Sequence, residues 1–176
     1  DTGDEGRSIP KVLRLKKGAR ADEKTLGGDA INTFSFMVIE DYLDALKWAT
    51  FEGGLSGLIR RCEANFNARA EWVEATSWVD FVAEVPAQRS TTSVCLKFVD
   101  PAVTAPPSEV QAKLAAKIAS LLAIEGVAFD VNGYRAAPPG LRVWCGCTVA
   151  TDDIDALLPW LDWAYAEALA GLKAEA

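Results

Sequence analysis

Two arginines that lie close together in the sequence, Arg135 and Arg142, are the residues best suited to binding a charged small molecule. Arg142 stands near the start of residues 140–149, GLRVWCGCTV, which have the β-branched and aromatic content of a strand. Arg135 lies in the preceding loop, NGYRAAPPG, which is rich in turn-forming residues. Because a guanidinium binds a carboxylate or a phosphate through two parallel hydrogen bonds, the pair predicts a site for an anionic ligand. The alternative is that one or both arginines form structural salt bridges.

The chain contains no histidine, which removes the commonest general base, the usual catalytic triads and the usual metal ligands. Cys145 and Cys147 are weak metal or redox candidates, because no third and fourth ligand follow at zinc spacing. Alternation along a strand would place both thiols on the same face of a sheet, which favours packing in the core. We therefore expect no metal site.

Length and composition favour one compact domain. The 176 residues, half of them apolar, suffice for one domain with a core but not for two of ordinary size. The formal net charge of −7 argues against nucleic acid or an anionic membrane as partner. With no long apolar run and no signal-like leader, we expect neither a membrane span nor secretion, and a cytoplasmic location fits. The four cysteines lie in apolar patterns, so we expect them to be reduced and mostly buried.

Apolar residues at three- and four-residue spacing predict two amphipathic helices, over residues 32–49 and 55–75, as the first elements of the scaffold that holds these arginines. Either Asn32 or Thr33 can cap the first helix, and the same geometry also suits a phosphate. In the second helix we expect an apolar inner face and a charged outer face. The expected inner residues are Leu58, Ile59, Cys62, Phe66, Trp72 and Val73, and the expected outer residues are Arg60, Arg61, Glu63 and Arg69.

Strand-like runs follow at residues 78–85 and 90–98, and the short connection between them predicts antiparallel pairing. Arg89, in that connection, is expected to serve the turn rather than an anion.

Ser108 and Gln111 form a capping-box pattern that opens a third helix, and residues 127–131 read as a short strand. A last helix should start with Thr151 as its N-cap and bend at Pro159. Residues 1–30 are charged and weakly periodic, so we expect a connecting segment there and a domain over residues 31–176.

Several long strings resemble one family in their order and content. They are INTFSFMVIEDYLDALKWA from residue 31, GGLSGLI, RSTTSVCLKF from residue 89, YRAAPPGLRVWCGCTV from residue 134, and DIDALLPWLDWAYAE from residue 153. Together they resemble the phosphoserine aminotransferases, especially the bacterial branch. The resemblance implies a fold-type I pyridoxal 5'-phosphate enzyme with a large cofactor domain and a small C-terminal α/β domain. The chain is similar to the small domain, which implies a mainly antiparallel short sheet packed against helices.

The same resemblance implies roles for individual residues. It assigns the substrate's α-carboxylate to Arg142, the substrate's phosphate to Arg135, and the cofactor phosphate of the other subunit of a homodimer to Asn32 and Thr33. None of Lys11, Lys16, Lys17 and Lys24 stands in the motif of the family's cofactor-binding lysine. We therefore expect no catalytic residue in this chain and no activity without the lysine-bearing large domain.

The implied reaction transfers an amino group between phosphoserine and 2-oxoglutarate or glutamate in serine biosynthesis. Two alternatives remain open. One is a non-catalytic binding or interaction module derived from such a domain, and the other is a related transaminase with another acidic substrate. The sequence departs from the family pattern at Phe34, Ser35 and Phe36, which follow Asn32-Thr33, and at Cys147.

Overall fold

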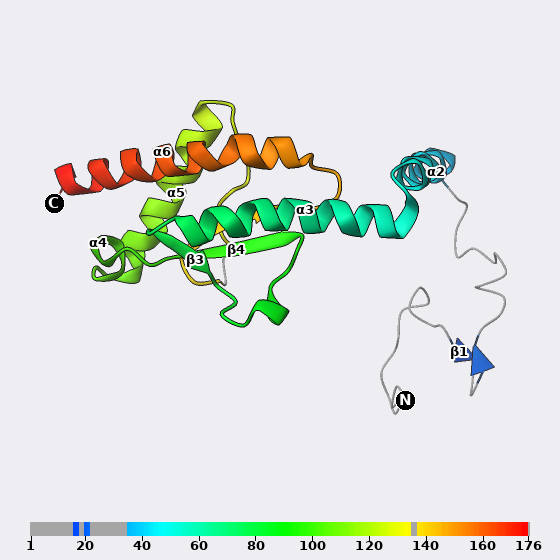
Figure 1. Ribbon diagram of the computed structural model, residues 1–176, viewed down its shortest axis with the longest axis horizontal. Coiled ribbons are helices and arrows are strands. Elements are labelled where there is room, and N and C mark those ends of the chain that lie inside the picture. The colour runs from blue at the N-terminus through cyan, green and yellow to red at the C-terminus, as the bar shows by residue number, and fades with distance from the viewer. Residues whose placement is uncertain (1–15, 18–19, 22–34, 135–136, 176) are drawn as a thin grey trace. The chain divides into compact units, whose positions relative to one another are not determined.

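The computed structural model describes residues 16–17, 20–21, 35–134 and 137–175 (Figure 1). The chain divides into two units, with the boundary between Trp48 and Ala49. The first includes the antiparallel pair β1 (Lys16–Lys17) and β2 (Arg20–Ala21) and most of helix α2 (Phe36–Phe51). No residue of α2 is buried, so the apolar face that its periodicity predicts does not form a core here. The expected boundary between residues 30 and 31 lies outside the described residues and stays a prediction.

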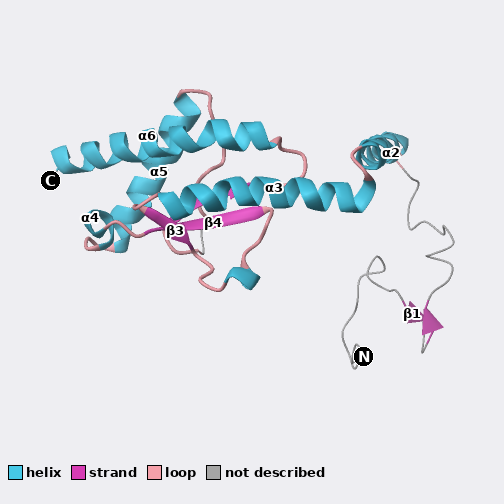
Figure 2. Cartoon of the chain, viewed as in Figure 1, coloured by secondary structure: helices cyan, strands magenta, loops and turns pink. Residues whose placement is uncertain are grey.

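The second unit contains a three-stranded antiparallel sheet in the order β3 (Val79–Phe81), β4 (Ser93–Phe98), β5 (Gly140–Trp144). Its helices are α3 (Gly54–Ala75), the short α4 (Pro101–Thr104), α5 (Ser108–Ile124) and α6 (Thr151–Glu175). Figure 2 shows α3 and α6 running side by side, and α5 packs against both α6 and β5. The predicted fold class, a short antiparallel sheet packed against helices, is confirmed.

Strand β4 is the central strand, because it pairs with β3 on one side and with β5 on the other, and its side chains alternate between core and surface. Val94, Leu96 and Phe98 are buried and the residues between them are only partly buried. In the register of the sheet, Leu96 pairs with Phe81 on one side and Leu141 on the other. Each fully buried side chain of this size contributes about 1.5–3 kcal/mol through the hydrophobic effect. The central strand therefore fixes the place of β5, which carries Arg142.

Three local predictions are wrong. Residues 127–131 form no strand, and the structure has an isolated bridge between Asn132 and Leu141 instead. Pro107 occupies the N-cap of α5 and no side chain caps it, so the Ser108 capping box is not formed. Thr151 is the first residue of α6 rather than its N-cap, since the backbone N–H of Ile154 donates to the Ala150 carbonyl. The Thr151 hydroxyl donates instead to Oδ1 of Asn65, 2.8 Å away. Helix α6 continues through Pro159 as one element.

Helix α3 turns inward the side that its apolar pattern predicts, but polar residues share that side. Of the expected inner residues, Val73 is buried, and Phe66 and Trp72 pack partly buried against the core. Its buried residues are Gly57, Asn65, Arg69 and Val73, the last three spaced by four, whereas Ile59 is exposed. This stripe is covered because α3 contacts both α6 and the sheet, which a single helix pattern does not reveal. Arg69 was expected on the outer face, and the structure corrects this: it is 0% exposed.

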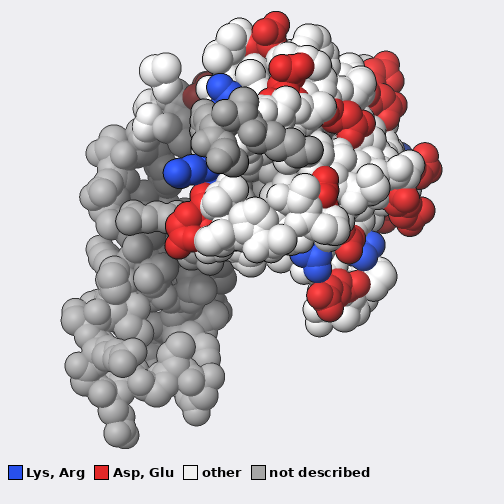
Figure 3. Space-filling view, turned by 90° about the vertical axis from the view of Figure 1, so that its left-hand side faces the viewer, with Lys and Arg blue, Asp and Glu red and all other residues white. Residues whose placement is uncertain are grey.

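Acidic side chains are spread over the face of the described chain seen in Figure 3, with fewer basic ones among them. This distribution agrees with the net charge of −7. Among the described helices, none combines the length and the apolar character that crossing a membrane requires.

Candidate functional site

Arg142 is held by a strand whose backbone is fixed on both sides. Its neighbour in β4 is Cys95, and its own backbone N–H donates to the Val131 carbonyl at 2.8 Å. At Gly140, a Cβ atom would lie 1.9 Å from the carbonyl oxygen of Leu96, so only glycine fits this close approach. The glycine that opens the GLRVW string therefore sets the position of the arginine two residues later.

The guanidinium of Arg142 contacts residues of the segment that precedes its strand. Its Nη2 donates to the carboxylate of Asp130 and, at 3.3 Å, to the Asp130 backbone carbonyl. The guanidinium carbon lies 4.7 Å from the centre of the Tyr134 ring, a cation–π contact. The hydrogen bond to Asp130 is the main cause that raises the pKa of Arg142 above its ordinary value, so the side chain carries its charge at neutral pH. One of the two alternatives for this arginine, a salt bridge, is thus realised in the structure.

A cavity of about 240 Å³ opens beside Arg142. Its apolar wall comes from the segment after α5, from β5 and from the first turns of α6. The apolar side chains are Val127, Ala128, Phe129, Val131, Val143, Trp144, Val149, Ile154 and Leu157. Among the described residues, the charged ones that line it are Arg142, Asp130 and Asp153, and no lysine lines it.

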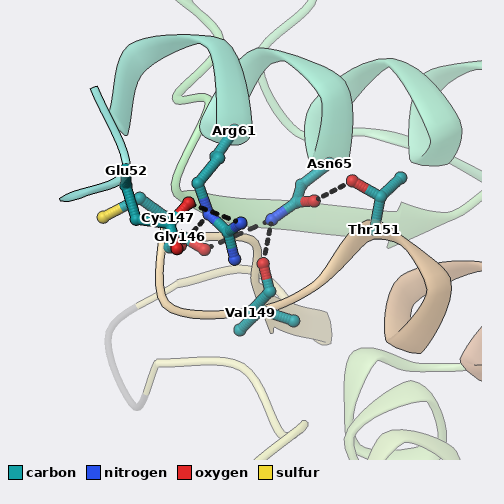
Figure 4. Close-up of polar contacts among 7 residues, drawn as sticks. All are labelled: Glu52, Arg61, Asn65, Gly146, Cys147, Val149 and Thr151. Atoms are coloured by element: carbon teal, nitrogen blue, oxygen red, sulfur yellow. Dashed lines mark hydrogen bonds and ion pairs between the residues drawn. The ribbon is translucent and has the colours of Figure 1, made fainter. Parts of the chain in front are cut away.

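The loop that joins β5 to α6 is held by polar side chains of α3 (Figure 4). The Nδ2 of Asn65 lies 3.2 Å from the carbonyls of Cys145 and Gly146 and 3.0 Å from that of Val149. One turn earlier in α3, Arg61 donates from Nε to the Cys147 carbonyl at 2.7 Å and from Nη1 to Glu52 at 3.1 Å. These contacts fix the end of β5, just beyond the arginine.

Sequence reasoning missed Asn65 and Asp130. For Asn65 the available signal was its place in α3: it lies three residues after Cys62 and seven after Leu58, on the predicted inner side of the helix. For Asp130, an acidic residue ahead of the arginine loop was visible, but nothing in the spacing indicated its pairing with Arg142.

The other candidate residues fall into two groups. Asn32, Thr33 and Arg135 lie outside the described residues. Arg89 acts in its turn, as predicted: its Nε donates to the Ala83 carbonyl at 3.1 Å and its guanidinium covers the Phe81 ring at 4.0 Å.

All four cysteines are free. Cys145 is buried and the other three are only partly buried, so the prediction that most of the cysteines are buried is wrong. Cys145 and Cys147 follow β5 rather than lying in it, and the expected alternation on one sheet face does not apply to them. No group of three or more candidate metal ligands lies together in the described part of the chain.

Comparison with curated proteins shows which proteins this chain is homologous to. The chain is 41% identical over 157 residues to the phosphoserine aminotransferase of Methanosarcina mazei and 39% identical over 157 residues to that of Methanosarcina barkeri. The chain is a homologue of part of phosphoserine aminotransferase. Each match covers 89% of the chain and 40% of the relative, so the chain spans about two fifths of the length of these enzymes.

A putative phosphoserine aminotransferase of a Mycobacterium species is 28% identical over 162 residues. Among solved structures, the phosphoserine aminotransferase of Bacillus circulans subsp. alkalophilus matches with a TM-score of 0.66 at 18% identity. That match covers 83% of this chain and 37% of the other, and it shows the fold. No family model matches the chain.

Proposed function

We propose that this chain forms the C-terminal domain of a phosphoserine aminotransferase, which transfers an amino group between phosphoserine and 2-oxoglutarate or glutamate in serine biosynthesis. The observation that carries the proposal is the 41% identity to such an enzyme over 89% of the chain. The structural likeness to a second enzyme of that name supports the same fold for this part. Activity then belongs to the complete enzyme and not to this chain alone.

Within that enzyme, Arg142 binds the α-carboxylate of the substrate. The proposal is supported by a charged guanidinium on a fixed strand beside a largely apolar cavity, where a carboxylate contact is strong because water is partly excluded. Arg135 recognises the phosphate of the substrate. A carboxylate held in one orientation presents its amino group to the reacting centre in one orientation, which is the contribution of this domain to rate.

The cofactor, pyridoxal 5'-phosphate, is held elsewhere in the enzyme. The described residues around Arg142 do not fit it, because no lysine is among those that line the cavity. We assign the cofactor to the large domain, with Asn32 and Thr33 reaching the cofactor phosphate of the other subunit of a cytoplasmic homodimer.

The test uses the complete enzyme, purified with its large domain, and an assay for glutamate formation from phosphoserine and 2-oxoglutarate. We expect turnover, and we expect Arg142→Met to raise KM for phosphoserine by roughly 100-fold, since hydrogen bonds to charged groups contribute about 1.5–3 kcal/mol each. Arg60, an exposed residue of α3, gives a matched control as Arg60→Met. Turnover of another acidic amino acid but not phosphoserine would assign the related transaminase instead. Absence of any bound cofactor in the complete protein would assign a binding module.

A further inference from the structure

The partner of Arg142 in the structure is itself a carboxylate. Nη2 of Arg142 donates hydrogen bonds to the carboxylate and to the backbone carbonyl of Asp130. A bound acid would accept hydrogen bonds from the same guanidinium. A ligand carboxylate that uses this nitrogen has to take the place of the Asp130 carboxylate. The two carboxylates therefore compete for one donor.

The two sides of this ion pair differ in freedom to move. The Arg142 side chain is 16% exposed, its buried Nε has no hydrogen-bond partner among the described residues, and its guanidinium lies against Tyr134. The Asp130 side chain is 82% exposed. Water can solvate the Asp130 carboxylate once it leaves the arginine, because that side chain is exposed. The Arg142 side chain is largely covered by protein. Exchange therefore moves the aspartate and leaves the arginine in place.

The backbone at Asp130 supports this assignment. Among the described residues, Asp130 is the one non-glycine residue with a positive φ, +57°. Such a conformation is costly for most residues and is better tolerated by aspartate and asparagine. The next residue, Val131, is buried and accepts the backbone hydrogen bond of Arg142, so the segment is anchored immediately beside the turn. The fold thus presents the Asp130 carboxylate to the arginine from a fixed backbone.

We propose that Asp130 is a displaceable internal carboxylate, which occupies Arg142 in the empty site and is replaced by the α-carboxylate of the substrate. This inference rests on the proposed function of Arg142. It gives Asp130 a role in specificity, because a neutral group such as an amide exchanges poorly against a carboxylate on a guanidinium, whereas a second carboxylate exchanges readily.

The test compares Asp130→Asn with Asp153→Asn in the complete enzyme. Both variants remove one negative charge from the same cavity, but Asp153 has no contact with Arg142 among the described interactions. With an exposed ion pair removed, we expect Asp130→Asn to lower KM for phosphoserine by about 1.5- to 5-fold with kcat nearly unchanged. Asp153→Asn should change KM less. A raised or unchanged KM in Asp130→Asn, or equal effects of both variants, would overturn the inference.

A second measurement does not depend on the reaction. An arginine-selective dicarbonyl reagent, applied without substrate and followed by peptide mass spectrometry, should modify Arg142 several-fold faster in Asp130→Asn than in the wild type or in Asp153→Asn. Equal rates would show that Asp130 does not cover Arg142 and would overturn the inference. If the wild-type enzyme fails to turn over phosphoserine, the proposed function fails, and the modification rates alone decide whether Asp130 occupies the arginine.

Discussion

Replacing Asn65 by alanine tests how strongly the loop after β5 is held. The Asn65 side chain is 0% exposed, and its amide faces three backbone carbonyls at 3.0–3.2 Å while its Oδ1 accepts from Thr151. An amide has two hydrogens, so two of the three carbonyls are bonded at a time and the third shares. Alanine leaves at least two of these groups without a partner and opens a small cavity.

The size of the expected loss of stability depends on which of these hydrogen-bonding groups are buried, because water can replace Asn65 only at groups that it can reach. The hydrogen bonds to Cys145 and Gly146 are buried, whereas those to Val149 and Thr151 are only partly buried, so water can replace the latter two. With about 1–3 kcal/mol for each buried group left unsatisfied, we expect Asn65→Ala to lower the free energy of unfolding by about 2–4 kcal/mol.

Asn67→Ala is the matched control. It lies in the same helix and is exposed, and it carries the same gain in helix propensity, about 0.5 kcal/mol. The difference between the two variants therefore isolates the tertiary hydrogen bonds. Urea unfolding of this chain, followed by tryptophan fluorescence, measures both. A difference below about 1 kcal/mol would refute the reasoning, because the loop would then be held by contacts other than Asn65.

Two further substitutions test buried polar groups elsewhere in the core. Arg69→Met should raise the free energy of unfolding by about 1–3 kcal/mol, because among the described residues the buried guanidinium has no polar partner except the Cys145 thiol; a lower urea midpoint would contradict this. Burial lowers the pKa of Arg69, and the nearby Cys145 thiol offsets that only in part, which agrees with an unfavourable environment. Burial and the hydrogen bond to Asp100, 2.5 Å long, raise the pKa of Tyr165 well above its ordinary value. The folded state thus favours the neutral phenol of Tyr165. The contribution of this phenol to stability is complete below about pH 10 and is lost as pH rises towards the raised pKa. In an alkaline titration followed by phenolate absorbance, one tyrosine should therefore ionise at higher pH than the others, and Tyr165→Phe should remove that step.

The sequence predicts the elements whose signals are local. Apolar periodicity located α3 and α6 to within a few residues, and alternation located β4. Helix α3 starts where Gly53 and Gly54 take positive φ values of 96° and 64°, a conformation that few other residues adopt. These features depend on neighbours in the chain, so a pattern is enough to find them.

The candidate site was predictable only in part. The sequence pointed to Arg142 by its residue type and its strand, but Arg135, Asn32 and Thr33 lie outside the described residues and stay predictions. Asn65 was missed and Arg69 was misread because a polar side chain is not expected on the apolar side of α3, where α6 and the loop after β5 cover it. Such burial is a property of tertiary contacts between residues some 80 positions apart.

The contacts at the two ends of β5 explain why exchange at Arg142 should be a side-chain event. At the start of the strand, Gly140 approaches Leu96 so closely that the register cannot slip without a clash. At its end, Asn65 ties the following loop to α3. Between these anchors the backbone of Arg142 is bonded to Val131, so a ligand cannot be accommodated by moving the strand. Among the described partners of the guanidinium, the exposed Asp130 carboxylate is the one that a ligand carboxylate can replace on Nη2. The substitutions at Asn65 and Asp130 therefore test separate properties: the first should alter stability, and the second should alter substrate affinity while leaving the fold intact.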